Sequence, residues 1–190
     1  MKYTDICNIV QSEISEVLNS IDENSLNEFI DIIIKSNKIL GYSAGRMGFG
    51  LKAFLMRLNH LVIPAYWYGD NYIPPMDEND LFICCSNSGT TKSVVNIADI
   101  FRNKANGYIA SFVGNENSTL ASLSDVVIKF KTCNGGLNSV DSSSKINSIQ
   151  PMTTLTEQAM FILFDVIIMM IIKRKNIKIN DTKKFHSNIE

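Results

Sequence analysis

The chain has few of the residues that build metal centres or disulfide frameworks. Of its 190 residues only 2 are histidine and 4 are cysteine. No CxxC pair or His/Cys cluster has the spacing of metal ligands, so we expect no metal site. Cys84 and Cys85 are adjacent in an apolar run, where neighbouring side chains point to opposite faces, and this argues against a disulfide framework. We expect the cysteines to act as small buried hydrophobic residues.

An excess of either charge is also missing. The 18 Lys and Arg residues nearly balance the 19 Asp and Glu residues, which leaves no broad basic field for nucleic acid or an anionic membrane. Residues 1–5 lack the pattern of a secretory signal. The apolar stretch 159–172 is shorter than the roughly 20 residues of a membrane-spanning helix, and it carries Asp165. We therefore predict a cytoplasmic protein that binds neither nucleic acid nor a membrane.

The chain does contain an alternation of helical patterns with short apolar runs. Two amphipathic helices are predicted over about residues 3–35, the second with Ser25 as its N-cap and Glu28 three residues later, as in a capping box. Apolar runs ending in Gly, Ser or Asn then alternate with helical segments, which is typical of parallel α/β proteins. The expected strands are 39–42, 61–66, 81–85, 108–113 and 126–130.

These elements predict one α/β domain over residues 1–190. The length and the 45% hydrophobic content are enough for a single substantial core. We expect a three-layer sandwich, with a five-stranded parallel sheet flanked by helices. A C-terminal helix and tail are predicted at about 152–190. Because this helix is apolar nearly all round, it also predicts an oligomer.

A hydroxyl-rich turn stands between the third predicted strand and the helix that follows. It reads Ser86-Asn87-Ser88-Gly89-Thr90-Thr91. The N–H groups and the dipole of a helix start favour an anion, hydroxyls add neutral donors, and Gly89 lets the backbone approach closely. The alternative is that the hydroxyls only cap the helix.

A second loop strengthens the prediction of an anion site. Ser43-Ala44-Gly45-Arg46-Met47-Gly48 follows the first strand and opens a helix in the same way, so both loops can face one ligand at the carboxyl edge of the sheet. The lysine of a nucleotide P-loop and the GxGxxG spacing are both missing, which disfavours a nucleotide. The predicted phosphate-binding residues are Ser43, Gly45, Ser86, Asn87, Ser88, Gly89 and Thr91.

These motifs resemble the sugar isomerase (SIS) domain, a family of phosphosugar-binding α/β proteins, and within it the 6-phospho-3-hexuloisomerase branch. The similarity covers nearly the whole chain and depends most on residues 86–91 and 150–158. It implies the SIS fold, assembly as a homodimer or homotetramer with sites near subunit boundaries, and a sugar phosphate as partner. It further implies interconversion of 3-hexulose 6-phosphate and fructose 6-phosphate without a metal or organic cofactor.

The resemblance also implies roles for four side chains. Glu157 matches the family's proposed base, which moves a proton between C2 and C3 of the sugar through an enediol; the alternative is an acid that favours a helix start. Arg46 matches a basic position that could stabilise enediolate charge or hold phosphate. His60 and His186 lie in family-like motifs and could assist ring opening or polarise the carbonyl. His60 could equally be structural, and His186 acts only if the polar tail folds onto a site, a neighbour's included.

Three positions depart from the family pattern. Met47 stands where the family commonly has Ser, Thr90 where it has Glu, and Phe185 where it has Arg. These changes could shift the substrate preference or mark a divergent member with weak activity. The alternatives are another aldose–ketose phosphosugar isomerase and a non-catalytic phosphosugar sensor. No helix-turn-helix or basic extension precedes the domain, which argues against a self-contained transcription factor.

Overall fold

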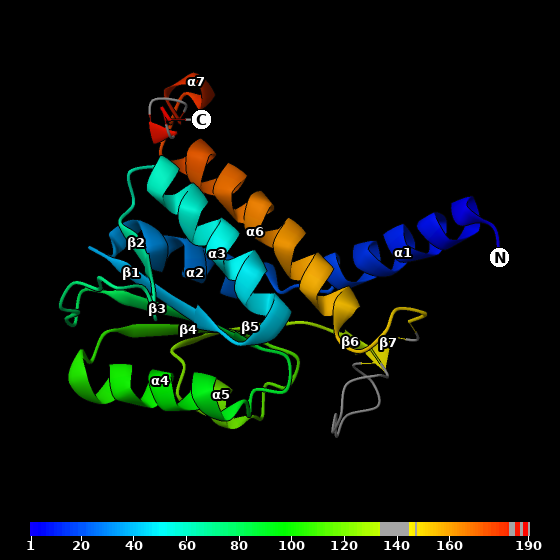
Figure 1. Cartoon of the computed structure of the whole chain (residues 1–190), viewed down its shortest axis with the longest axis horizontal. Coiled ribbons are helices and arrows are strands. Elements are labelled where there is room, and N and C mark those ends of the chain that lie inside the picture. Colours follow the sequence, from blue (N-terminus) through cyan, green and yellow to red (C-terminus); the bar gives the residue numbers. More distant parts are fainter. Residues whose placement is uncertain (134–144, 147, 183–184, 187, 190) are drawn as a thin grey trace.

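The computed structural model describes residues 1–133, 145–146, 148–182, 185–186 and 188–189 of the chain. Its centre is a sheet of five parallel strands in the order β2-β1-β3-β4-β5 (Figure 1). The strands are β1 (Ile39–Ser43), β2 (Ala65–Trp67), β3 (Leu81–Ser86), β4 (Tyr108–Val113) and β5 (Val126–Lys129). The predicted fold class, a parallel sheet between helices, is confirmed.

Helices cover both faces of the sheet and complete three layers. The helices are α1 (Tyr3–Leu18), α2 (Glu23–Lys35), α3 (Gly45–His60), α4 (Lys92–Lys104), α5 (Thr119–Ser122), α6 (Thr154–Arg174) and α7 (Ile179–Thr182). Figure 1 shows α4 and α5 on one side of the sheet and α2, α3 and α6 on the other, where α1 reaches outward from the base of α6. The sheet is therefore buried on both faces, as its nearly continuous apolar strands require.

In strand β3, successive side chains point alternately to the two faces of the sheet. All six of its residues are buried. Cys85 belongs to the core under α2, α3 and α6, whereas Cys84 belongs to the core under α4. Both thiols are free, and burial raises the pKa of each well above its ordinary value. The two cysteines thus act as buried hydrophobic residues on opposite faces, as predicted.

Phenylalanines join α6 to the rest of the larger core. Phe54 of α3 stacks on Phe164 of α6 with ring centroids 4.5 Å apart. Phe112 of β4 meets Phe164 edge-on at 5.0 Å and Phe29 of α2 at 5.1 Å. Such aromatic contacts are directional as well as apolar. They hold α6 against the sheet, so that the start of α6 lies at the carboxyl edge of the strands.

Two boundaries differ from the sequence prediction. The second strand was expected at 61–66 but is formed by Ala65–Trp67, because α3 continues to His60 and Leu61 is its C-cap. The N-cap of α2 is Asp22, whose carboxylate accepts a hydrogen bond from Ser25 N at 2.8 Å, so Ser25 itself lies inside the helix. At the start of α2, the cap is therefore supplied by the carboxylate of Asp22.

A small second sheet was not predicted. Strand β6 (Thr132–Cys133) pairs in parallel with β7 (Lys145–Ile146). This region is rich in Ser, Asn and Gly, and two-residue strands carry no periodic signal that a sequence reading could detect. The pair lies beside the start of α6 (Figure 1).

The length of α6 does not exclude a membrane-spanning helix. The helix has 21 residues and is the one helix among the described residues that is long and apolar enough to cross a membrane, judged by length and composition. It extends past the 159–172 stretch at both ends, so shortness does not argue against a span. Half of its most apolar part is buried inside the molecule, as in the core helix of a folded domain. The absence of membrane binding stays a prediction.

Candidate active site

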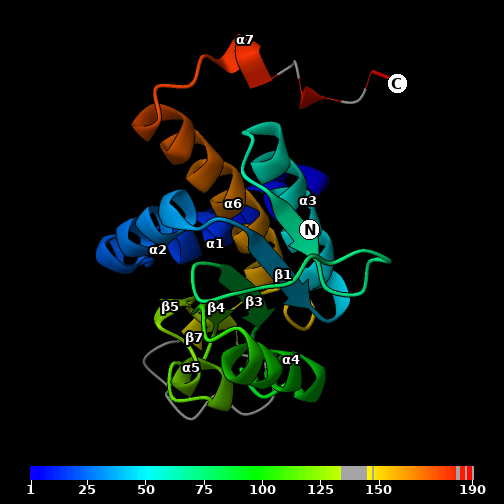
Figure 2. The same cartoon turned by 90° about the vertical axis from the view of Figure 1, so that its left-hand side faces the viewer.

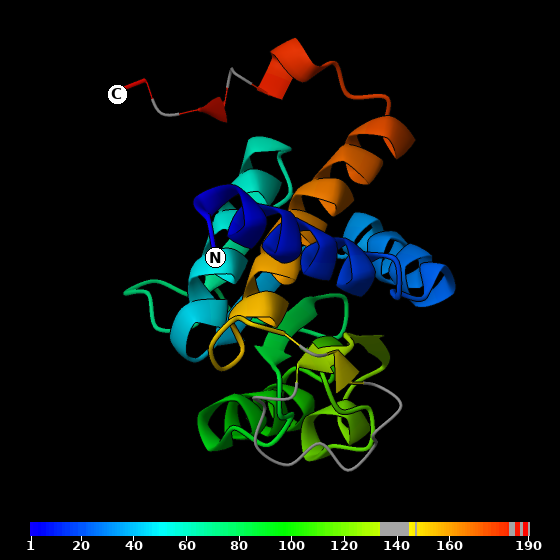
Figure 3. The ribbon, with the colours of Figure 1, turned by 90° about the vertical axis from the view of Figure 1, so that its right-hand side faces the viewer.

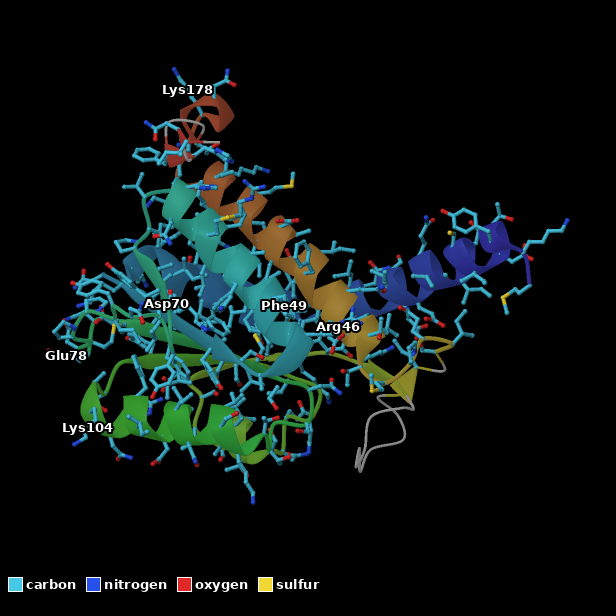
Figure 4. The ribbon with its side chains drawn as sticks, in the orientation of Figure 1. Arg46, Phe49, Asp70, Glu78, Lys104 and Lys178 are labelled. Carbon is cyan, nitrogen blue, oxygen red and sulfur yellow. The ribbon has the colours of Figure 1, made fainter. Side chains whose placement is uncertain are left out.

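Three helices begin around one cavity at the carboxyl edge of β1 and β3. Helix α3 follows Ala44, α4 follows Thr91 and α6 follows Thr153. The cavity has a volume of about 420 Å³. Its lining comprises Ala44, Gly45, Arg46, Met47, Cys85, Ser86, Asn87, Ser88, Thr91, Met152, Thr153 and Glu157. Both predicted loops therefore face the same space, and Figure 4 labels Arg46 where the start of α3 approaches the start of α6.

The helix starts at this cavity are open to an anion. The side chains of Ala44, Thr91 and Thr153, all in the described part of the chain, make no capping hydrogen bond. Thr91 Oγ1 instead lies 2.8 Å from Ser86 Oγ. The alternative interpretation, in which the hydroxyls of the turn cap α4, therefore does not hold for Thr91. N–H groups at uncapped helix starts, together with the helix dipoles, attract a phosphate or carboxylate group.

Gly89 shapes the turn but does not line the cavity. Its φ is +66°, in the left-handed region, and its N–H donates to Ser86 O at 2.9 Å. A Cβ at this position would lie 1.9 Å from Ser118 Oγ. Glycine is thus required by both conformation and space. The contact with Ser118 gives one reason for glycine here, and the predicted approach of the Gly89 backbone to a ligand stays a prediction.

Glu157 and Arg46 form an ion pair in the wall of the cavity. Glu157 Oε2 of α6 lies 3.0 Å from Arg46 Nε of α3, and Glu157 Oε1 accepts a hydrogen bond from Thr153 Oγ1 at 2.8 Å. The Glu157 side chain is 13% exposed, whereas that of Arg46 is 59% exposed. The carboxylate is held in place while the guanidinium can still reach a ligand. Such a pair can move a proton and stabilise the oxyanion that forms beside it.

Asn87 supplies another polar atom at this site. It lines the cavity, and its Oδ1 is buried without a hydrogen-bond partner among the described residues. Buried polar atoms are normally paired, so such an atom in a cavity wall suits a ligand hydroxyl. No group of three or more His, Cys, Asp or Glu side chains that could hold a metal ion occurs in the described ranges.

Ser43 is not brought to the cavity. Its hydroxyl is buried and donates to Cys85 O at 2.8 Å, which joins β1 to β3 where the two residues are in register. Although the sequence predicted Ser43 as a phosphate donor, its hydroxyl is therefore not among the groups that could donate to a phosphate in this cavity. Position in the loop was the only signal for it, and the strand pairing decided the direction of the side chain.

The two histidines lie together at the other end of α3. His60 is the last residue of that helix, and 15 residues separate it from Gly45, a distance of roughly 22 Å at 1.5 Å per residue. The His186 ring lies 5.4 Å from the His60 ring. Figures 2 and 3 show α7 lying beyond this end of α3. Within one chain neither histidine reaches Glu157, and their predicted catalytic roles stay predictions.

Met152 is part of the cavity wall, which was not predicted from the sequence. Met152 has a left-handed backbone, with φ of 52°, and the residue is 70% exposed. Non-glycine residues rarely adopt this conformation, and no sequence pattern indicated it. Met47, where the family commonly has a serine, also lines the cavity and belongs to the core. A thioether thus replaces one possible hydroxyl donor.

Comparison with known proteins shows the family to which the chain belongs. Residues 33–162 match the SIS domain. The chain is 29% identical over 190 residues to the 3-hexulose-6-phosphate isomerase of Bacillus subtilis, with 100% of both chains covered. It is 32% identical over 167 residues to the enzyme of the same name from Methanocaldococcus jannaschii, covering 88% of this chain and 85% of that one.

A solved structure extends the likeness to three dimensions. A hypothetical protein from Methanococcus jannaschii, whose crystal structure was described as inferring a molecular function of 3-hexulose-6-phosphate isomerase, superimposes with a TM-score of 0.80. The two chains are 30% identical, and the match covers 97% of this chain and 98% of the other. The chain belongs to the SIS domain family, and within that family it groups with phosphosugar isomerases.

Proposed function

We propose that the protein is a 6-phospho-3-hexuloisomerase, which interconverts 3-hexulose 6-phosphate and fructose 6-phosphate. The observation that carries this proposal is the Glu157–Arg46 pair on the same cavity as the uncapped starts of α3 and α4. An anion site alone would suit any phosphosugar-binding protein. A restrained carboxylate beside a guanidinium adds the means to move a proton. The curated relatives that carry this enzyme name support the choice of sugar.

The phosphate is assigned to the start of α4. The hydroxyls of Ser86, Ser88 and Thr91 line the cavity there, and they donate to phosphate oxygens without requiring a counter-charge. The dipole of α3, which begins at Gly45, adds to the same field. Binding the phosphate end fixes the distance between the sugar carbons and Glu157, so that orientation is provided before the chemistry begins.

The proton transfer balances without an external oxidant or reductant. Glu157 takes the proton from C2 of the 3-ketose, the electron pair forms a C2=C3 double bond, and the C3 carbonyl oxygen becomes an oxyanion beside Arg46. That oxygen takes the proton of the C2 hydroxyl, which leaves the negative charge of the enediolate on the C2 oxygen. The C2 carbonyl then forms from this oxygen as C3 takes back the proton from Glu157. A single carboxylate can serve both steps because it acts first as base and then as acid.

Incubation with fructose 6-phosphate in deuterated water tests the proposal. We expect deuterium at C3 together with formation of the 3-ketose, both detectable by NMR. Deuterium at C1 instead would indicate an enediol between C1 and C2 and hence an aldose–ketose isomerase. Tight binding of fructose 6-phosphate without exchange at either carbon would contradict the enzyme and support a phosphosugar sensor.

A further inference from the structure

Glu13 is a buried carboxylate that the proposed chemistry does not use. It lies on α1 and is only 7% exposed. Its Oε2 accepts hydrogen bonds from Ser148 Oγ at 2.7 Å and from Gln150 Nε2 at 2.9 Å. Its Oε1 accepts one from Ile149 N at 2.9 Å. Three donors from consecutive residues thus converge on one carboxylate, which offsets the cost of removing the charge from water.

The segment held by Glu13 leads directly into the cavity wall. Residues 148–150 are followed by Pro151 and then by Met152 and Thr153, both of which line the cavity. Thr153 Oγ1 donates to Glu157, and Glu157 N donates to Thr153 O at 3.0 Å. A continuous series of contacts therefore runs from Glu13 to the Glu157 carboxylate. Figure 3 shows α1 lying across α6, and the hydrogen bonds to Ser148, Ile149 and Gln150 place Glu13 at this segment.

The backbone conformation of Met152, just after this segment, must be held by contacts with other parts of the chain. Met152 has a left-handed backbone, which costs a residue with a side chain about 1–2 kcal/mol. Ordinary local preference would not select this conformation, so packing and hydrogen bonding on either side must maintain it. On the preceding side, the bonds to Glu13 are tertiary contacts that join residues 135 to 137 positions apart in the chain.

We infer that Glu13 is a positioning residue for Glu157: its carboxylate fixes residues 148–150 and so sets where α6 begins and where Glu157 meets Arg46. The inference rests on the proposed function of the cavity. It assigns to α1 a role beyond covering the core. The turn at Ser88, to which the phosphate is assigned, is not part of this connection. Glu13 therefore affects the position of Glu157 and leaves phosphate binding unaffected.

The test replaces Glu13 with methionine, which fills a similar volume but accepts no strong hydrogen bond. Glu13→Gln serves as the conservative variant, because its amide oxygen can still accept from Ile149 N, and Ser148 and Gln150 can each offer an acceptor to its NH₂ group. Glu16→Met is the matched control: Glu16 is an exposed acid on the same helix. For each variant we would measure kcat and KM for fructose 6-phosphate, the Kd of inorganic phosphate by calorimetry, and hydrogen exchange.

We expect Glu13→Met to lower kcat by about 10- to 100-fold, as for a small displacement of a catalytic group, with the phosphate Kd near that of the parent. The melting temperature should fall moderately, because Ser148, Ile149 and Gln150 lose their acceptor. Amides of residues 148–157 should exchange faster, while those of α4 stay protected. Glu13→Gln should retain most of the activity, and Glu16→Met should match the parent. Parental kcat in Glu13→Met, or a loss of phosphate affinity as large as the loss of kcat, would overturn the inference.

Failure of the proposed function would look different. If the parent neither turned over nor exchanged deuterium into any phosphosugar, the isomerase proposal would fail. Hydrogen exchange would then decide the positioning role by itself. Faster exchange at both 148–150 and 153–157 in Glu13→Met, with α4 unchanged, would support the connection from Glu13 to Glu157. Faster exchange confined to 148–150 would overturn it.

Discussion

Glu157 is held from two sides, by Thr153 at one oxygen and by Arg46 at the other. Glu157→Gln keeps the shape and much of the hydrogen bonding but cannot accept a proton from the sugar. We expect kcat to fall by about 10²–10⁴-fold, the usual cost of losing a general base. Steady-state kinetics with 3-hexulose 6-phosphate would measure this.

Asp165→Asn is the matched control for that change, because Asp165 is an exposed acid on the same helix. It should leave kcat unchanged. A Glu157→Gln variant that works within about threefold of the parent, far less than a lost base costs, would assign the base to another residue. A purely structural acid at a helix start contributes only about 0.3–1 kcal/mol of stability and little rate.

Ser88 lines the cavity, and its hydroxyl contacts Thr90 of the same turn. Ser88→Ala removes a donor to a charged ligand, which contributes about 1.5–3 kcal/mol. We expect the affinity for phosphate or fructose 6-phosphate to fall roughly 10- to 100-fold, measured by calorimetry, with the fold intact. Thr90→Ala is the control, since Thr90 is not among the lining residues of the cavity. Equal affinities for Ser88→Ala and the parent would remove this hydroxyl from the phosphate site.

Glu13 also makes stability depend on pH. Burial alone would raise its pKa, but the hydrogen bonds from Gln150, Ser148 and Ile149 lower that pKa below the ordinary value of 4.5. The charged form is therefore favoured by folding. Its stabilisation is fully present above about pH 4.5 and is lost as the pH falls through the lower folded-state pKa. Acid titration of the unfolding free energy should show a smaller decline in Glu13→Met than in the parent; an identical decline would contradict this.

At the scale of elements, two strand-to-helix turns use glycine in different ways. Gly45 and Gly89 both have a positive φ, but a Cβ on Gly45 would meet no atom within 4 Å, whereas one on Gly89 would collide with Ser118. Gly45→Ala should cost about 1–2 kcal/mol for the backbone alone. Gly89→Ala should cost an additional 1–3 kcal/mol or so from overpacking. Urea unfolding would measure both.

The double variant Gly89→Ala/Ser118→Gly isolates the collision. Ser118 also caps α5, with its Oγ accepting from Ala121 N at 3.3 Å, so Ser118→Gly alone should cost a few tenths of a kcal/mol. If the collision dominates, the double variant is more stable than Gly89→Ala alone. A purely additive loss would contradict the contact seen between these two positions.

At the scale of the whole molecule, the outward face of α3 and α6 remains apolar. Phe49 is 74% exposed and is labelled in Figure 4, and Met56, Phe161 and Met169 are exposed as well. A helix that is apolar nearly all round has more apolar surface than one chain covers. We predict a homodimer or homotetramer in which this face is buried between copies.

Light scattering tests the assembly. Met169→Glu places a charge on the exposed part of α6 and should dissociate the oligomer, because an unpaired charge is costly to bury in an interface. Ile100→Glu is the control: Ile100 is also exposed, but it lies on α4 at the opposite face of the sheet. A parent that is monomeric at micromolar concentration, or a Met169→Glu variant that stays assembled, would contradict the prediction.

The helices and strands could be predicted from the sequence more accurately than the contacts between them. The strands at 39–43, 81–86 and 108–113 follow from local apolar runs, and the turn at 86–91 from its hydroxyls and glycine. The second strand was misplaced because the same apolar residues, Leu61 and Ile63, suit the end of a helix packed into a core. Periodicity cannot separate these two cases in a run so short.

The parallel α/β class could be predicted from local patterns, because hydrophobic periodicity and turn chemistry act over a few residues; anion binding at the turn 86–91 stays a prediction. The pairing of Arg46 with Glu157, the bond from Ser43 to β3 and the place of the histidines at the far end of α3 depend on tertiary contacts. Only the fold brought Glu13 to residues 148–150. Contacts of this kind depend on how α1, α3 and α6 pack against one another, and no local pattern encodes that arrangement.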